Sequence, residues 1–184
     1  MLNEAVVAAF LSVWLAVFFS VNLHNIVKSH RRKNGTRTYA EVERPFGLAI
    51  ALAAVGTFAY FLVTLLLLFL IFFGLSSKLS GFPLSFQFPF MDYVQILGLI
   101  LTSLGYFLFI WSVIVRGRYA TSWEMPEHQK LVTWGPYRYV RHPSYLGYFL
   151  MFVGLFLLWP NVFTFFPILA VPGYYQITFE EERL

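Results

Sequence analysis

The chain contains no cysteine, so disulfide bonds, thiolate metal sites and cysteine nucleophiles are all excluded. It is also poor in charge. Only 12% of its 184 residues are Asp, Glu, Lys or Arg, about half of what a soluble domain usually carries. Hydrophobic residues make up 59% of the chain and aromatic residues 21%. This balance is typical of a protein that sits in a lipid bilayer.

Three long apolar stretches contain no charged residue: Ala5–Val27, Gly47–Gly74 and Tyr93–Val115. A helix needs about 20 such residues to cross the hydrocarbon core, and a backbone in lipid must be helical to satisfy its own hydrogen bonds. The sequence therefore predicts an all-α, polytopic transmembrane helix bundle that forms a single integral membrane domain over residues 1–184. A cleaved signal peptide is the alternative for the first stretch. It would begin with basic residues, whereas Glu4 is the only early charge.

The second apolar stretch carries small residues at helical spacing. Gly47 and Ala51 are four positions apart, and so are Ala49 and Ala53. In a membrane, small residues at this spacing allow two helix backbones to approach closely. We therefore expect both pairs to pack against a neighbouring helix.

The basic residues are distributed unevenly over the loops. The first and third loops hold eleven of the thirteen, and the second loop holds one. Loops rich in Lys and Arg stay in the cytoplasm, so we expect the amino terminus outside and the first and third loops inside. The net charge of +4 is then a signal of topology, and no nucleic-acid partner is predicted. The eleven residues are Lys28, Arg31, Arg32, Lys33, Arg37, Arg44, Arg116, Arg118, Lys130, Arg138 and Arg141.

The last apolar region, Ser144–Leu184, cannot be one straight helix, because prolines at 160, 167 and 172 interrupt it. The natural break is the stretch Trp159-Pro160-Asn161, which leaves a helix of about 16 residues before it and a second helix after it. The sequence thus predicts three spanning helices followed by a proline-broken helical hairpin, with both hairpin ends at the cytoplasmic face. In such a hairpin His142 and Glu180 would approach one another, although they are 38 positions apart.

The stretch Arg141-His142-Pro143-Ser144-Tyr145 has two interpretations. As the end of a membrane helix it is well formed: proline suits the first helical turn, arginine the membrane boundary and tyrosine the aromatic belt. Alternatively, it holds a reactive small molecule. Three successive glutamates, residues 180–182, weakly favour the second interpretation, because acids near a helix C-terminus oppose the helix dipole.

A larger pattern runs through residues 128–184 and resembles the membrane methyltransferases typified by isoprenylcysteine carboxyl methyltransferase. That superfamily also includes phospholipid N-methyltransferases. Ser144 and the stretch Leu131-Val132-Thr133 look more like the isoprenylcysteine branch. The elements that carry the resemblance are His128, Leu131-Val132, Gly135-x-Tyr137, Arg141-His142-Pro143-x-Tyr145-x-Gly147 and Glu180-Glu181-x-x-Leu184.

The resemblance implies S-adenosylmethionine as the cofactor and no metal. Paired carboxylates suit its ammonium and ribose hydroxyls, an arginine suits its carboxylate, and tyrosine rings suit its sulfonium. Glycines allow a close approach of the backbone. The implied catalytic residues are Arg141, His142 and Tyr145. The implied cofactor-binding residues are His128, Leu131, Val132, Gly135, Tyr137, His142, Pro143, Tyr145, Gly147, Glu180 and Glu181.

The implied function is that of an integral membrane, S-adenosylmethionine-dependent methyltransferase with a cytoplasmic active site, most like protein-S-isoprenylcysteine carboxyl O-methyltransferase. Its partners would be membrane lipids and a lipophilic methyl acceptor that enters from the bilayer. A carboxylate acceptor is ionised at neutral pH and needs no base, whereas an amine or thiol must lose a proton. Two enzymatic alternatives are a phospholipid N-methyltransferase and a small-thiol methyltransferase. A third alternative is a non-catalytic membrane subunit or scaffold.

Two departures from the family pattern bear on the predicted site. Chains of this family usually continue past the glutamates into a short soluble tail, whereas this sequence ends at Leu184. If that tail closes the pocket, we expect weaker cofactor binding. Gln176 stands where related sequences often have arginine, so one anchor for a carboxylate is expected to be weaker.

Overall fold

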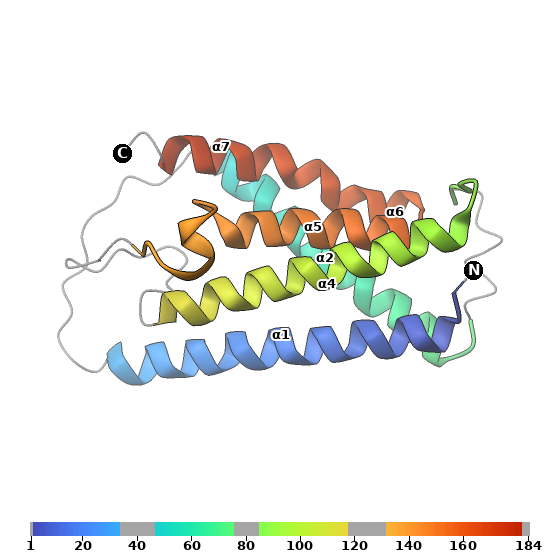
Figure 1. Cartoon of the computed structure of the whole chain (residues 1–184), viewed down its shortest axis with the longest axis horizontal. Helices are drawn as coiled ribbons and strands as arrows, with labels where there is room; N and C mark the ends of the chain where they lie inside the picture. The colour runs from blue at the N-terminus through green and yellow to red at the C-terminus, as the bar shows by residue number, and fades with distance from the viewer. Residues whose placement is uncertain (1, 34–46, 76–84, 118–131, 182–184) are drawn as a thin grey trace.

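The computed structural model describes residues 2–33, 47–75, 85–117 and 132–181, and these form a bundle of elongated helices (Figure 1). The first three long helices are α1 (Glu4–Lys33), α2 (Gly47–Phe72) and α4 (Met91–Arg116). They run in alternating directions along the long axis of the molecule. Each begins and ends within a few residues of its predicted apolar stretch, except that α1 continues into the basic segment after Val27. The three predicted spanning helices are confirmed as helices of sufficient length.

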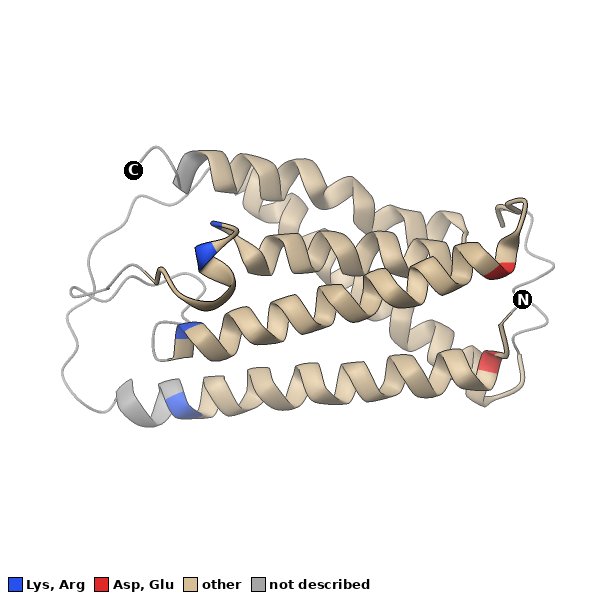
Figure 2. Cartoon of the chain, in the orientation of Figure 1, with Lys and Arg blue, Asp and Glu red and all other residues tan. Residues whose placement is uncertain are grey.

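Charged residues gather at the two ends of the bundle (Figure 2). Glu4 and Asp92 lie at one end, which we call the acidic end. The described Lys and Arg residues lie at the other, which we call the basic end: Lys28, Arg116, Arg138 and Arg141. The long faces between the two ends carry no described charge, as a bilayer requires. Which end faces the cytoplasm stays a prediction.

The last part of the chain folds back on itself as a hairpin. Its first arm is α5 (Pro143–Leu158), and its second arm is the succession α6 (Val162–Phe165), η3 (Phe166–Ala170) and α7 (Val171–Glu181). Pro167 lacks an N–H group and cannot continue α-helical hydrogen bonding, so the second arm tightens into a 3₁₀ segment there. The start of α5 and the end of α7 both lie at the basic end. The predicted hairpin is confirmed.

The second arm stays helical over a longer apolar stretch than expected from a segment with prolines at 167 and 172. Residues 162–179 form a helical stretch of 18 residues that is long and apolar enough to cross a membrane, as are Glu4–Lys28, α2 and α4. Helix α5, with 16 residues, is shorter. At about 1.5 Å per residue α5 spans about 24 Å, so the hairpin reaches across most of a bilayer of about 30 Å.

The polar groups of the hairpin turn form hydrogen bonds with one another. The Asn161 side chain accepts a hydrogen bond from the backbone N–H of Thr164 at 3.0 Å, and the Thr164 hydroxyl accepts one from the Asn161 N–H at 3.2 Å. The Asn161 side chain also donates to the Trp159 carbonyl at 3.0 Å. From outside the turn, the Phe86 N–H donates to the Pro160 carbonyl at 2.9 Å. An isolated bridge between Ser85 and Asn161 is the only strand-like pairing in the described part of the chain.

Helices α4 and α5 pack backbone to backbone through four glycines. A Cβ atom at Gly105 would lie 2.7 Å from the Gly147 carbonyl oxygen, and one at Gly154 would lie 2.6 Å from the Thr102 amide nitrogen. Neither separation is possible for a real side chain, so only glycine fits. We call this contact the glycine seam, formed by Gly98, Gly105, Gly147 and Gly154.

Helix α2 packs against the second arm of the hairpin through small residues. Ala49 and Ala53 are buried there, and a Cβ atom at Gly173 would lie 2.8 Å from the Ala49 carbonyl oxygen. The prediction for Ala49 and Ala53 is therefore confirmed. The prediction for Gly47 and Ala51 is wrong, since both are exposed. Two positions along a helix correspond to a rotation of about 200°, which turns that pair to the opposite face.

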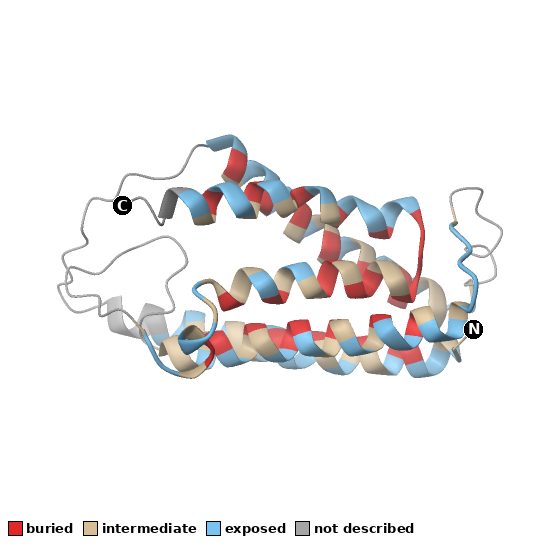
Figure 3. Ribbon diagram, turned by 45° about the horizontal axis from the view of Figure 1, so that its top comes forward, coloured by how far each residue is buried: buried red, intermediate tan, exposed pale blue. Residues whose placement is uncertain are grey.

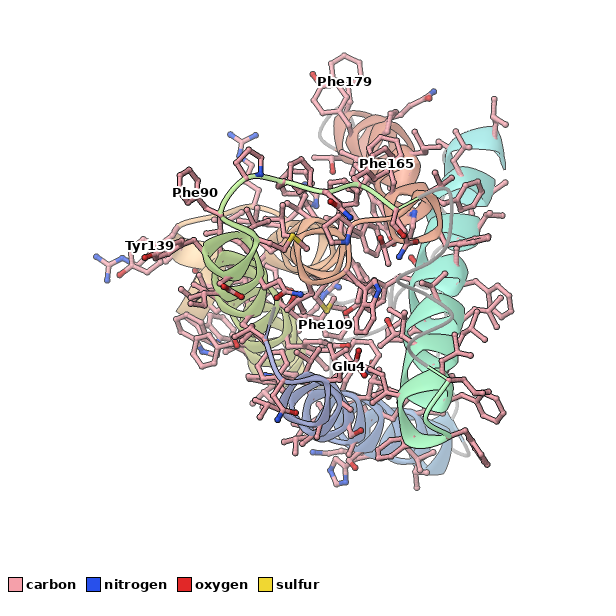
Figure 4. All side chains as sticks on the ribbon, turned by 90° about the vertical axis from the view of Figure 1, so that its right-hand side faces the viewer. Glu4, Phe90, Phe109, Tyr139, Phe165 and Phe179 are labelled. Atoms are coloured by element: carbon pink, nitrogen blue, oxygen red, sulfur yellow. The ribbon has the colours of Figure 1, made fainter. Side chains whose placement is uncertain are left out.

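Buried residues line the inward faces of the helices, and exposed residues line the outward faces (Figure 3). Many of the exposed residues are large and apolar, such as Phe58 and Phe69. In the interior Tyr60 donates a hydrogen bond to Tyr106 at 3.0 Å. The view along the bundle axis shows Phe109 pointing inward and Phe179 pointing away from the bundle (Figure 4). An apolar exterior around a core with a few paired polar groups is the arrangement expected in lipid.

Candidate functional site

A short 3₁₀ helix, η2 (Gly135–Arg138), lies against the end of α4 at the basic end. Gly135 has a φ of +64°, and a Cβ atom there would lie 2.9 Å from the Val115 side chain. This glycine lets η2 begin close to α4. Tyr137 in η2 has a buried hydroxyl group that finds no hydrogen-bond partner among the described residues. Buried polar atoms usually have a partner, so this hydroxyl is a candidate for contact with a ligand.

His142 and Tyr145 form a stacked pair at the start of α5. His142 is the N-cap residue, with a φ of −121°, and Pro143 is the first helical residue, as expected from its fixed φ. The His142 carbonyl accepts hydrogen bonds from the backbone N–H groups of Tyr145 and Leu146, both at 3.1 Å. The imidazole and phenol rings are nearly parallel, with their centroids 5.4 Å apart and an interplanar angle of 9°. The helix start thus holds both side chains in one orientation.

Other residues of the predicted site are spread along the same end. Arg141 is exposed beside His142, Pro143 is buried, and Val132 is half-buried ahead of η2. Gly147 belongs to the glycine seam, so its described close contacts are with α4. Its role at the cofactor stays a prediction.

The predicted carboxylates come from the other arm of the hairpin. Glu180 and Glu181 form the last turn of α7, which ends at the basic end, as does the start of α5 that carries His142. The hairpin thus excludes an arrangement with the two motifs at opposite ends of the bundle. His128 and Leu131 lie outside the described residues.

The structure adds residues that the sequence analysis did not single out. The Tyr174 ring of α7 contacts Tyr145 and Tyr148 of α5, with ring centroids 5.2 and 5.6 Å apart. The Tyr174 hydroxyl is hydrogen-bonded to the hydroxyl of Thr57 in α2. The signal was present in the sequence, because tyrosines far from the ends of an apolar helix need an interior partner.

The described residues contain no group of three His, Cys, Asp or Glu side chains arranged to hold a metal ion. The groups that lie together at the basic end are the buried phenol hydroxyl of Tyr137, the stacked rings of His142 and Tyr145, and the end of α7. Rings and hydroxyl groups of this kind suit an organic ligand with a cationic centre and polar groups.

Comparison with known proteins agrees with this description. The family model of phospholipid methyltransferases matches residues 93–184, half of the chain. The match begins in α4, at Tyr93, and includes η2, both arms of the hairpin and all the predicted site residues. No curated protein and no solved structure matches the chain. The chain therefore belongs to the phospholipid methyltransferase family, which supports its assignment as a membrane methyltransferase.

Proposed function

We propose that this protein transfers the methyl group of S-adenosylmethionine to a lipophilic acceptor that reaches the site from the bilayer. The observation that carries the proposal is the hairpin. It brings the start of α5, with His142 and Tyr145, and the end of α7, with Glu180 and Glu181, to one end of the bundle. A single cofactor can contact two segments only if they lie on the same side of the membrane.

The residues present fit this cofactor. Bound S-adenosylmethionine supplies an electrophilic methyl group on a sulfonium. The Tyr137 hydroxyl, which has no hydrogen-bond partner in the described part of the chain, would bond to one of its polar groups, and the Tyr145 ring offers a π face to positive charge. Glu180 and Glu181 would bind the ammonium and the ribose hydroxyls through charge-assisted hydrogen bonds. The task of the protein is then to orient the acceptor, since positioning alone supplies several kcal/mol of the lowered barrier.

Two acceptors have support from different observations. Ser144 and the stretch Leu131-Val132-Thr133 favour a prenylcysteine carboxylate, which attacks without a base. The family match favours a phospholipid amine, which must first lose a proton. His142, which stacks on Tyr145 at the start of α5, would accept that proton. The two acceptors therefore make different demands on His142.

The test uses the whole chain in vesicles with methyl-labelled S-adenosylmethionine and one acceptor at a time: phosphatidylethanolamine, a farnesylated cysteine or a small thiol. We expect label in one lipophilic product. If the acceptor is an amine, His142→Gln should lower turnover by about 100-fold or more, as expected for loss of a proton acceptor. If it is a carboxylate, the loss should be much smaller. Tyr139→Phe, an exposed neighbour, is the control. A chain that labels no acceptor and binds no cofactor would contradict the proposal.

The same proposal requires the basic end to face the cytoplasm. The absence of cysteine makes this testable with single introduced thiols. Tyr139→Cys, just after η2 at the basic end, and Gln87→Cys, just before α4 near the acidic end, both replace exposed residues. We expect a membrane-impermeant thiol reagent to label Gln87→Cys from outside the cell and Tyr139→Cys only after the membrane is opened. The reverse pattern would place the site on the outer face.

A further inference from the structure

Tyr174 is fixed at its hydroxyl end by a residue on another helix. Thr57 of α2 donates its hydroxyl proton to the Ala53 carbonyl at 2.8 Å. A threonine hydroxyl has one proton, so in its hydrogen bond with Tyr174 the Thr57 oxygen must accept and Tyr174 must donate. The Tyr174 hydroxyl therefore donates its proton to Thr57 of α2. The ring, and not the hydroxyl, is what Tyr174 presents to α5.

The Tyr174 ring meets a row of rings on α5. Its centroid lies 5.2 Å from Tyr145, 5.6 Å from Tyr148 and 6.3 Å from Phe152. These three residues, spaced three and four positions apart, share one face of the helix. Tyr145 in turn stacks on His142. A continuous series of contacts thus runs from Thr57 through Tyr174 and Tyr145 to the imidazole.

The backbone on the α2 side of this series is closely packed. Gly173, the residue before Tyr174, lies so close to α2 that a Cβ atom there would be 2.8 Å from the Ala49 carbonyl oxygen. Ile177, one turn after Tyr174, is buried with Ala49 and Ala53, and Tyr145 packs against this small cluster. Tyr174 therefore projects from a fixed backbone toward the rings of α5.

We propose that Thr57 and Tyr174 are a positioning pair for the methyl-transfer site. By holding the Tyr174 ring, the pair sets the orientation of Tyr145 and, through it, of His142. This inference rests on the proposed function for its biological meaning, but the orientation of His142 is measurable without cofactor or acceptor.

The first experiment follows the His142 ring by nuclear magnetic resonance. The chain has four histidines, and His142→Gln identifies the right signal in the ¹³C-histidine-labelled whole protein in detergent. Stacking on Tyr145 should shift the His142 signal away from the position of an exposed histidine. Thr57→Val and Tyr174→Phe should each move the signal toward that position, because each removes the same hydrogen bond. Thr57→Ser keeps the hydroxyl, so the His142 signal in this variant should stay at the wild-type position.

Thr178→Val is the matched control. Thr178 lies one turn beyond Tyr174, and its hydroxyl donates a hydrogen bond to the Tyr174 carbonyl in its own helix, at 2.9 Å. It should leave the His142 signal in place. An unchanged signal in both Thr57→Val and Tyr174→Phe would overturn the inference. So would an equal displacement in Thr178→Val or a displaced signal in Thr57→Ser.

A second experiment measures the effect on ligand binding and turnover. Thr57→Val and Tyr174→Phe should each weaken binding of S-adenosylmethionine or lower turnover by about 2- to 12-fold, the range for one lost hydrogen bond. The double variant should be no worse than either single variant, because both remove one shared contact. Additive losses would overturn the pairing. If the wild type neither binds cofactor nor transfers methyl, the proposed function fails, and the histidine signal still decides the positioning pair.

Discussion

Helix α5 is packed by different means on its two sides. Toward α4, Gly147 and Gly154 bring the α5 backbone directly against the α4 backbone. Toward α7 it meets the ring of Tyr174 with three rings of its own, a contact that we call the ring seam: Tyr145, Tyr148, Phe152 and Tyr174. The glycine seam is a contact between two backbones, whereas the ring seam is a contact between side chains. The predicted site residues His142 and Tyr145 lie on the side that is packed by side chains.

The glycine seam should be the more sensitive of the two to substitution. Gly154→Val would push a branched side chain into the Thr102 backbone and separate α4 from α5. We expect a loss of about 3 kcal/mol in the free energy of unfolding or a failure to fold, toward the upper end for overpacked sites. Thermal unfolding in detergent measures it. Gly47→Ala, with nothing within 4 Å of the added atom, is the control and should be neutral or slightly stabilising.

The second largest loss of stability is expected when the hydrogen bonds of Gln95 at the acidic end are removed. Gln95 of α4 accepts a hydrogen bond from the Leu2 N–H at 2.8 Å and donates one to the Leu158 carbonyl at the end of α5, at 3.0 Å. Gln95→Leu removes both bonds, of which the one to Leu158 is buried, and this should cost about 1–3 kcal/mol. The same unfolding assay measures it. Gln87→Leu, at an exposed position, should cost nothing measurable.

Substitution within the ring seam should have the smallest effect. Tyr148→Phe keeps the ring that contacts Tyr174 and nearly the same volume, so stability should fall by less than about 1.5 kcal/mol. The melting temperatures of Tyr148→Phe and Gly154→Val, measured side by side, test the comparison directly. Equal losses would mean that the two sides of α5 are equally intolerant and that the distinction fails.

The sequence predicted those features whose causes are local. Pro160 lacks the N–H group that would continue α5, so the turn and the 16-residue arm before it followed from the sequence alone. Ala49 and Ala53 were identified by spacing, but spacing does not say which helix packs on them. The pair Thr57 and Tyr174 lies beyond such reasoning, because 117 positions separate the two residues and no local pattern joins them.

The glycine seam lies between these cases. Gly98 and Gly105 are seven positions apart, and so are Gly147 and Gly154, which is two helical turns in each helix. Two apolar helices with the same glycine spacing indicate that they pack against one another. The resemblance assigns Gly147 to the cofactor, whereas the seven-residue spacing indicates a helix contact for the same glycine.

The hairpin turn also bears on how the protein enters the membrane. Trp159, Pro160 and Asn161 are buried and uncharged, and Asn161 and Thr164 already pair the polar groups of the turn with one another. Moving such a turn across the hydrocarbon layer strips little water from it, because few of its polar groups are left to lose hydration. Helices α5 to α7 can therefore insert together as one unit during biosynthesis. His142 and the two glutamates, at the open end of the hairpin, would then stay together on the side of the bilayer from which it inserts.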